Sequence, residues 1–321
     1  MKHYLGIDVG SISTKLVLID EKNQVLFPLY IRTEGNPIRA IQRGLRELND
    51  HIKNRHLNID IAGVGTTGSA RYLAGAITGA DLVKNEITAH AKGVSRFIPE
   101  VRTVIEIGGQ DSKIIILENG VAVDFAMNLI CSAGTGAFLD AQAFRLGIPI
   151  EKFGEIALKS QNPTLIGSRC TVFCESDMIH KQQIGHKTED IVAGLCQGLA
   201  RNFLASVAKG KNIQSPIVFL GGVSENVGMK RAFEKALGEK IVVPEYNKVM
   251  GALGVAILVR ESAPPKAKFF GFGISDKDIR CTSFQCQGCP NRCEVIEARI
   301  DGEIAARWGD RCGKWSNLIP T

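Results

Sequence analysis

The sequence predicts an α/β protein that consists of two similar halves followed by a short cysteine-rich tail. Three observations predict this fold class. A strand–turn–strand pattern occurs twice, segments with helical spacing of apolar residues follow each copy, and the composition changes beyond Ala263. With 321 residues, the chain is long enough for two domains.

The repeated pattern is an apolar strand, a polar glycine turn and a β-branched strand, at an offset of 98 residues between Leu5–Asp20 and Thr103–Glu118. The aligned positions are Asp8 with Glu106, Gly10 with Gly108, Ser13 with Asp111, and Lys15 with Lys113. Backbone amides in such turns can hold phosphates, and a carboxylate just before the turn can hold hydrated Mg²⁺. One glycine turn joins many ordinary strands, but two in register predict two halves that close on one ligand.

Helices are expected between and after these hairpins, because apolar residues recur there at helical spacing. The first follows a proline-marked start. The expected helices are 36–48, 139–146, 189–209 and 250–259, and a buried strand beginning at Ile217 ends in the Gly221-Gly222 turn. Residues 263–268 form a linker.

Composition excludes several classes of function. The formal charge of +6 is spread along the chain without a basic block, so we expect no nucleic-acid role. We expect no membrane span or signal peptide, since no apolar run reaches about 18 residues and Met1 leads directly into a strand. Nine cysteines without an export signal favour the reducing cytoplasm and metal or redox use over disulfides. Cys174 and Cys196 are interpreted as buried apolar side chains.

A second glycine-rich turn, Cys131-Ser-Ala-Gly-Thr-Gly136, opens a helix. Such a turn suits an anion, and its helix terminus would also lower the pKa of a thiol and favour the metal-binding thiolate. Gly134 and Gly136 are therefore candidate nucleotide contacts. Because the hairpins already supply phosphate turns, Cys131 is better interpreted as a metal ligand, with Cys170 as its partner.

The tail contains a close group of cysteines and one distant cysteine. Cys286, Cys289, Cys293 and Cys312 form a plausible four-thiolate site, and Cys281 is the spare. The identity of the metal stays open: the site could hold an iron–sulfur cluster, additional to any iron bound by Cys131 and Cys170, or structural zinc. About 55 residues cannot bury much core, so a metal would help to stabilise the tail.

Six segments resemble the ATP-dependent activators of 2-hydroxyacyl-CoA dehydratases and benzoyl-CoA reductases, the BadF/BadG/BcrA/BcrD ATPase family of the sugar kinase/Hsc70/actin superfamily. They are 6–11, 85–91, 105–111, 128–136, 170–176 and 221–226. The resemblance implies two ribonuclease-H-like domains around an ATP cleft. These would be residues 1–95, with helix 250–261 returning to them, and 96–249, followed by a metal-binding module at 262–321.

The resemblance also implies a nucleotide site with ATP or ADP and Mg²⁺. Asp8 and Glu106 would organise Mg²⁺, with Asp8 acting through water, although the family usually has aspartate at position 106. The expected phosphate contacts are Gly10, Ser11, Ser13 and Lys15 on one side, and Gly108, Gly109, Gln110 and Asp111 on the other. Gln110 would orient the attacking water, and Gly221 and Gly222 would approach the adenosine.

Cys131 and Cys170 would, by the same resemblance, each bind iron. Two thiolates do not complete a four-cysteine site, so a homodimer sharing one [4Fe–4S] cluster is expected. ATP hydrolysis would drive delivery of a low-potential electron, received from ferredoxin or flavodoxin, to an acceptor iron–sulfur enzyme. Two alternatives stay open: a sugar or N-acetylhexosamine kinase of the same superfamily, and a non-enzymatic redox regulator.

Some polar residues permit two interpretations. Lys15 and Lys113 are either phosphate contacts or solvated charges at a strand edge. Glu86 and His90, four residues apart on one helix, are either a structural pair or part of the active site. His180 and His186 are expected on the surface.

Overall fold

The computed structural model describes residues 2–128 and 134–316. The chain divides into two compact units. Unit 1 comprises residues 1–93 and 249–321, and unit 2 comprises residues 94–248. The cysteine-rich tail thus belongs to unit 1.

Unit 1 contains a five-stranded sheet in the order β3-β2-β1-β4-β5. Its strands are β1 (Lys2–Val9), β2 (Ser13–Asp20), β3 (Val25–Arg32), β4 (Asp60–Thr67) and β5 (Leu82–Val83). β1, β2 and β3 pair antiparallel, whereas β4 pairs parallel with both β1 and β5. The first expected hairpin is confirmed as β1–β2, and the third strand β3 extends it.

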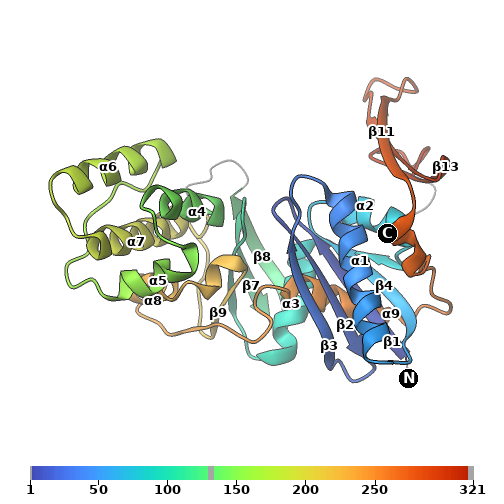
Figure 1. The fold of residues 1–321 in the computed structure, drawn as a ribbon, viewed down its shortest axis with the longest axis horizontal. Helices are drawn as coiled ribbons and strands as arrows, with labels where there is room; N and C mark the ends of the chain where they lie inside the picture. Colours follow the sequence, from blue (N-terminus) through green and yellow to red (C-terminus); the bar gives the residue numbers. More distant parts are fainter. Residues whose placement is uncertain (1, 129–133, 317–321) are drawn as a thin grey trace. The chain divides into compact units, whose positions relative to one another are not determined.

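The helices of unit 1 are α1 (Pro37–Asn54), α2 (Arg71–Thr78), α9 (Met250–Ser262) and most of α3 (Glu86–Phe97). Asn36 caps α1 by accepting a hydrogen bond from the Arg39 amide, as the proline-marked start predicts. Leu5 and Ile7 pack in one core with the apolar face of α1. Gly6 faces the other way, so close to the Ala252 carbonyl of α9 that a Cβ atom would clash. Strand alternation therefore places α1 and α9 on opposite faces of this sheet (Figure 1).

Unit 2 repeats this sheet topology in the order β10-β9-β6-β7-β8. Its strands are β6 (Thr103–Ile107), β7 (Ser112–Glu118), β8 (Val121–Asn128), β9 (Ile217–Leu220) and β10 (Ile241–Val242). β6, β7 and β8 pair antiparallel, and β9 pairs parallel with β6 and β10. The two sheets therefore have the same strand order and directions, as the internal repeat predicts.

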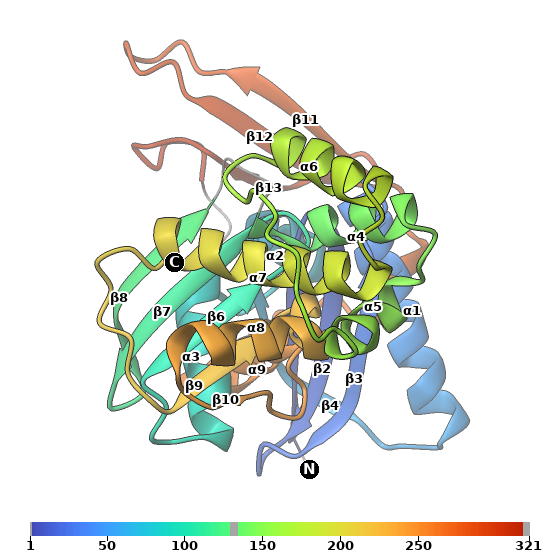
Figure 2. The same ribbon diagram turned by 90° about the vertical axis from the view of Figure 1, so that its left-hand side faces the viewer.

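Helices cover the unit 2 sheet with one large apolar core. They are α4 (Gly136–Arg145), α5 (Ile150–Leu158), α6 (Thr171–Gln183), α7 (Thr188–Ser206) and α8 (Val227–Leu237), with the short helix η2 (Gly222–Glu225) after β9. Figure 2 shows α6 alongside α7, and α7 alongside α8. The expected helices 139–146 and 189–209 correspond to α4 and α7. Unit 1 has a single helix between its third and fourth strands where unit 2 has four.

The tail forms a three-stranded antiparallel sheet that the sequence did not predict. The short helix η3 (Phe272–Asp276) precedes β11 (Ile279–Gln285), β12 (Glu294–Ile300) and β13 (Glu303–Trp308). Asp301 and Gly302 join β12 to β13 with φ angles of 50° and 87°, the backbone of a two-residue hairpin turn. Ala298 and Ala306 pack on Ala76 of α2. Among the described residues, no helix is both long and apolar enough to cross a membrane.

Candidate functional site

The β1–β2 turn of unit 1 places a carboxylate opposite a lysine. Asp8 and Lys15 are directly paired across the two strands, and Lys15 Nζ lies 3.2 Å from Asp8 Oδ2. The Gly10 amide donates to the Ser13 carbonyl at 2.9 Å, which closes the turn. The Thr33 hydroxyl donates to the Gly10 carbonyl at 2.9 Å and supports the turn from β3. Lys15 thus pairs with a carboxylate and is not a merely solvated charge.

Two glycines approach the Asp8 carboxylate closely. Gly68, directly after β4, has a φ of +90°, and a Cβ atom there would lie 2.4 Å from Asp8 Oδ1. Gly251, in the first turn of α9, would place a Cβ atom 2.9 Å from Asp8 Oδ2 and 3.3 Å from His90 Nε2. His90 is buried, so the structure favours its interpretation as a neighbour of the Asp8 site.

The β6–β7 turn of unit 2 contains the equivalent pair in a more buried form. Glu106 and Lys113 are directly paired across the strands, with Lys113 Nζ 2.7 Å from Glu106 Oε2. Lys113 Nζ also lies 3.0 Å from Asp111 Oδ1. The Lys113 side chain is 3% exposed, which excludes the interpretation as a solvated strand-edge charge. The Gly108 amide donates to the Asp111 carbonyl at 3.0 Å and closes this turn.

Gly221 stands in unit 2 where Gly68 stands in unit 1. It follows β9, the strand parallel to β6, just as Gly68 follows β4, the strand parallel to β1. Its φ is +85°, and a Cβ atom would lie 2.7 Å from Glu106 Oε1 and 2.3 Å from the Ile107 carbonyl oxygen. Each buried carboxylate therefore faces a glycine with left-handed backbone.

The predicted adenosine loop is held by a residue that the sequence did not single out. Asn247 Nδ2 donates to Ser224 Oγ at 2.7 Å and to Glu225 Oε1 at 2.6 Å. The Gly221 amide donates to the Asn247 carbonyl at 3.1 Å. These bonds fix the segment from Gly221 through η2, which includes Gly222.

Cys131 lies outside the described residues, but the helix that follows it is described. At the start of α4, the amides of Gly136 and Ala137 donate to the carbonyls of Gly108 and Gly109, both at 2.8 Å. These donors are thus engaged with the β6–β7 turn. The nucleotide contact predicted for Gly136 stays a prediction. A Cβ atom at Gly134 would lie 3.5 Å from Asn128 Nδ2 and 3.6 Å from Ser112 Oγ.

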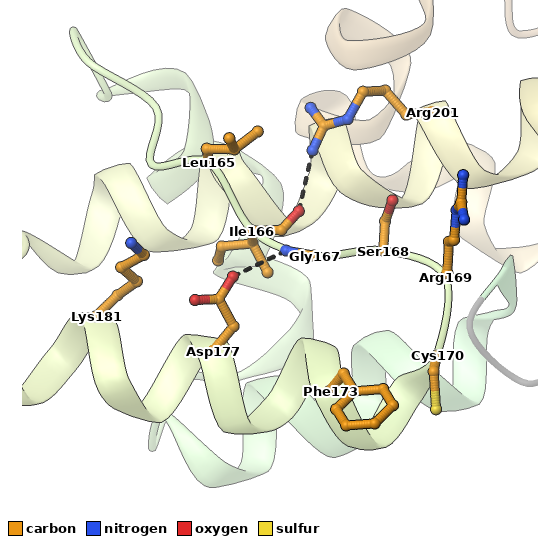
Figure 3. A pocket seen from close by; sticks show the side chains of 10 residues that line it. All are labelled: Leu165, Ile166, Gly167, Ser168, Arg169, Cys170, Phe173, Asp177, Lys181 and Arg201. Atoms are coloured by element: carbon orange, nitrogen blue, oxygen red, sulfur yellow. Dashed lines mark hydrogen bonds between the residues drawn. The ribbon is translucent and has the colours of Figure 1, made fainter.

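Cys170 occupies the N-cap position of α6, without a capping hydrogen bond from its side chain, and is half-buried. It borders a hollow of about 560 Å³ (Figure 3). The hollow's wall is fixed by two hydrogen bonds, from Arg201 Nη2 to the Ile166 carbonyl at 3.1 Å and from the Gly167 amide to Asp177 Oδ2 at 2.9 Å.

Large apolar side chains beside Cys170 are exposed. Val172 and Phe173, at the start of α6, are 66% and 73% exposed, and Phe144 at the end of α4 is 87% exposed. An ion pair from Arg145 Nη2 to Glu175 Oε1, 2.9 Å long, joins these two helices. We refer to Phe144, Val172 and Phe173 as the α4–α6 apolar patch. Large apolar side chains exposed on neighbouring helices are typical of an interaction surface.

Residues 5–259 match the BadF/BadG/BcrA/BcrD ATPase family. The chain belongs to this ATPase family. A 2-hydroxyisocaproyl-CoA dehydratase activator from Clostridioides difficile is 36% identical over 265 residues, which are 82% of this chain and 97% of the relative. An (R)-2-hydroxyglutaryl-CoA dehydratase activating ATPase from Acidaminococcus fermentans is 35% identical over 262 residues, which are 81% and 97% of the two chains.

A solved structure from the same family is similar in fold to this chain. It is the activator of the 2-hydroxyisocaproyl-CoA dehydratase from Clostridium difficile with bound ADPNP, 35% identical, with a TM-score of 0.73. The match covers 81% of this chain and 95% of the solved one. The predicted family membership and α/β fold are thereby confirmed.

The other two cysteines of unit 2 lie in its apolar core, as the sequence predicted. Cys174 and Cys196 are buried, and burial raises the pKa of each thiol to about 12. His180 and His186 are exposed, as predicted, and His186 Nδ1 lies 2.9 Å from Thr164 Oγ1.

Four of the five tail cysteines, Cys286, Cys289, Cys293 and Cys312, lie in two loops at one end of the tail sheet. Cys286 is 7% exposed, whereas Cys289 and Cys312 are exposed. A hydrogen bond from Trp315 and another from the Gly288 amide hold the pKa of the Cys286 thiol below its usual value. Within residues 2–128 and 134–316, no three His, Cys, Asp or Glu side chains stand close enough together to hold a metal ion.

Four site residues escaped the sequence analysis: Thr33, Gly68, Asn247 and Gly251. Gly68 had a usable signal, since Thr66-Thr67-Gly68 follows an apolar strand as Gly221 does. The distance to Gly221 differs from the 98-residue repeat because unit 2 inserts additional helices before β9. Thr33 and Gly251 reach the site only through strand pairing and helix packing.

Proposed function

We propose that this protein is an ATP-dependent reductive activator of a 2-hydroxyacyl-CoA dehydratase or a related iron–sulfur enzyme. Membership of the ATPase family and relatives named as dehydratase activators support this proposal. The observation that supports it best is the duplicated pair of a buried carboxylate and a lysine at a tight hairpin turn, Asp8 with Lys15 and Glu106 with Lys113.

The nucleotide would be ATP or ADP with Mg²⁺. Carboxylate oxygens are the ligands that Mg²⁺ prefers, so Asp8, acting through water, and Glu106 would organise the ion. The turn amides and the side chains of Ser11, Ser13 and Lys15 would contact phosphate. In unit 2, Gln110 is exposed at the tip of its turn, where it would orient the attacking water. The ADPNP bound by the solved relative supports a nucleotide ligand.

Asp111 would contribute to the nucleotide site through its contact with Lys113. Lys113 Nζ contacts both Asp111 and Glu106, so it fixes the spacing of the two carboxylates. The buried lysine compensates the negative charge of both carboxylates. The longer glutamate at position 106 is accommodated because Gly221 has no side chain at the point of contact.

Cys131 and Cys170 would hold one [4Fe–4S] cluster together with the same two residues of a second copy. Thiolate sulfur is the ligand of such clusters, and when bound the cluster supplies a low-potential electron for the partner enzyme. Cys170 suits this role because it is only half-buried and stands at the N-terminus of α6, beside the hollow. The adjacent α4–α6 apolar patch would be covered by the second copy.

Within this chain, the contact between the β6–β7 turn and α4 would couple the state of the nucleotide to the cluster. A nucleotide that shifts the turn at Gly108 and Gly109 shifts the amides of Gly136 and Ala137 with it. A helix that begins just after Cys131 would then respond to the state of the nucleotide. The electron donor would be ferredoxin or flavodoxin.

The deciding experiment is an electron-transfer assay under anaerobic conditions. Reduced, iron-loaded protein is mixed with a 2-hydroxyacyl-CoA dehydratase, and reduction of the dehydratase is followed with ATP, with ADPNP and without nucleotide. We expect reduction only with ATP. Reduction at equal rates in all three conditions contradicts the proposal, and so does transfer of phosphate from ATP to a sugar.

A further inference from the structure

The β11–β12 hairpin gathers three cysteines at one end of the tail sheet. Cys286 follows β11 directly, and Cys293 immediately precedes β12. The Cys286 amide donates to the Cys293 carbonyl at 2.8 Å and closes the loop that also contains Cys289. In Figure 1 this loop lies at the tip of the β11–β12 ribbon.

A second loop brings the fourth cysteine to the same end. β13 ends at Trp308, which pairs with Ile296 near the start of β12, so the segment that follows emerges beside the hairpin loop. The Trp315 ring packs edge-on against Phe284 of β11, with ring centroids 5.0 Å apart. Cys312 lies three residues before Trp315 in this loop. The two loops therefore meet around Cys286.

The sulfur of Cys286 is surrounded as a thiolate would be. It accepts hydrogen bonds from the Trp315 Nε1–H group at 3.3 Å and from the Gly288 amide at 3.4 Å. A neutral thiol is a weak acceptor, whereas a metal-bound thiolate is commonly supported by N–H donors of this kind. Two such donors on one nearly buried sulfur indicate a metal ligand.

Apart from Ile279 and Ile300, which pack on the core of unit 1, the tail sheet has little apolar packing to stabilise it. Its fully buried side chains include Val295, Ala298 and Ala306, which are small, and the cluster with α2 consists of alanines and Trp308. Folded segments with so small a core usually depend on a metal or on disulfides. All described cysteines are free thiols.

Cys281 is excluded from this group by its place in the sheet. It lies within β11, paired with Ala298, five residues before Cys286. Five residues of extended strand span about 17 Å, which is far more than a metal–thiolate bond of about 2.3 Å.

We propose that Cys286, Cys289, Cys293 and Cys312 bind one metal centre, zinc or an iron–sulfur cluster, at the open end of the tail sheet. Cys289 and Cys312 are exposed, and both would turn toward Cys286 when metal binds, Cys312 by giving up its 3.9 Å contact with Asp310 Oδ2. The family match ends at residue 259, so this centre is separate from the proposed ATPase chemistry.

The test measures metal in the full chain with Cys131→Ser and Cys170→Ser introduced, so that iron at the proposed intersubunit site is absent. After anaerobic purification and reconstitution with zinc, or with iron and sulfide, we expect about one zinc or about four irons per chain. The ratio of zinc to iron in protein before reconstitution decides between the two metals. Failure of the proposed function leaves this result unaffected.

Three single variants in that background make the test specific. We expect Cys289→Ser and Cys312→Ser each to lower the bound metal at least fivefold, whereas Cys281→Ser keeps the full amount. Equal metal content in all three variants overturns the proposal, as does the absence of both metals after reconstitution.

A second measurement on the unmutated chain does not depend on folding of the variants. Thiols are alkylated before and after removal of metal with a chelator, and labelled peptides are quantified by mass spectrometry. We expect the four proposed ligands to be protected before chelation and labelled afterwards, with Cys281 labelled to the same extent in both. Full labelling of all five before chelation overturns the proposal.

Discussion

The Gly136 amide donates a hydrogen bond to the Gly108 carbonyl at 2.8 Å, and this bond joins the β6–β7 turn to the start of α4. The contact is tight, since a Cβ atom at position 136 would lie 2.9 Å from that carbonyl oxygen and 3.1 Å from Val223 Cγ2. A movement of either partner must therefore be followed by the other. We therefore expect the proposed phosphate turn and α4 to move together.

Gly136→Ala tests this connection. The added methyl group pushes α4 away from the turn, so we expect ATP-dependent electron transfer to fall by at least about tenfold, equivalent to ~1.4 kcal/mol. Iron content should stay unchanged, because no thiol is altered. Gly273→Ala is the matched control, since a Cβ atom there meets no heavy atom within 4 Å. Equal rates of electron transfer in the two variants would show that α4 has no part in the coupling.

Gly68→Ala tests the site residue that the sequence analysis missed. Its Cβ atom would meet Asp8 Oδ1, and its backbone is left-handed. We expect the dissociation constant for ADPNP, measured by calorimetry, to rise at least about tenfold, or ~1.4 kcal/mol.

Gly210→Ala separates backbone strain from the contact with the carboxylate. Its φ is +74°, but no heavy atom lies within 4 Å of the ideal Cβ position. We expect a loss of about 1–2 kcal/mol in stability with no change in ADPNP affinity. If both variants bind ADPNP as the unmutated chain does, Gly68 has no part in the nucleotide site.

The contrast between Gly68 and Gly221 shows how far the sequence could predict this site. Asp8 and Glu106 were recognisable because each lies in a strand–turn–strand pattern that keeps a constant offset. Gly68 and Gly221 are equally related in space, but the chain between β8 and β9 contains helices with no counterpart in unit 1. Beyond such an insertion, equivalent residues no longer keep the 98-residue offset, so a comparison at constant offset does not align them.

The tail illustrates a different limit. Its cysteine spacing predicted a metal site, but the alternating pattern of its strands was not recognised. The signal for β12–β13 was present, since Asp301-Gly302 between apolar alternating residues is typical of a two-residue hairpin. By contrast, the packing of Trp315 on Phe284 depends on the return of the chain after β13, which local patterns do not specify.

Lys113→Met tests the buried ion pair of unit 2. Removal of one partner leaves Glu106 buried without its compensating charge, which typically costs about 3–5 kcal/mol. We expect a lower urea midpoint, monitored by circular dichroism. Lys15→Met is the matched variant in unit 1, and we expect a smaller shift because the Lys15 side chain is 15% exposed against 3% for Lys113. A larger shift for Lys15→Met would contradict this ranking of the two pairs.

Cys174 and Cys196 should resist alkylation in the folded protein. With a pKa of about 12, only about one thiol in ten thousand is ionised at pH 8, and the thiolate is the reactive form. Because burial raises these pKa values, reactivity stays low across the neutral range and increases only as the pH approaches 12. We expect both peptides to remain unlabelled by iodoacetamide at pH 8 and to be fully labelled in urea. Rapid labelling of either one without urea would show that the unit 2 core opens readily.

Phe173→Ser tests whether the α4–α6 apolar patch is the dimer surface. A phenylalanine that is 73% exposed contributes little to the fold of one chain, so we expect the urea midpoint to stay the same. If a second copy covers this side chain, its loss should raise the dimer dissociation constant at least about tenfold, measured by analytical ultracentrifugation. Iron content should fall in parallel, because the proposed cluster needs thiolates from both copies. Phe270→Ser, at an exposed position in unit 1, should change neither quantity. A dimer that persists with full iron in Phe173→Ser would place the subunit contact elsewhere.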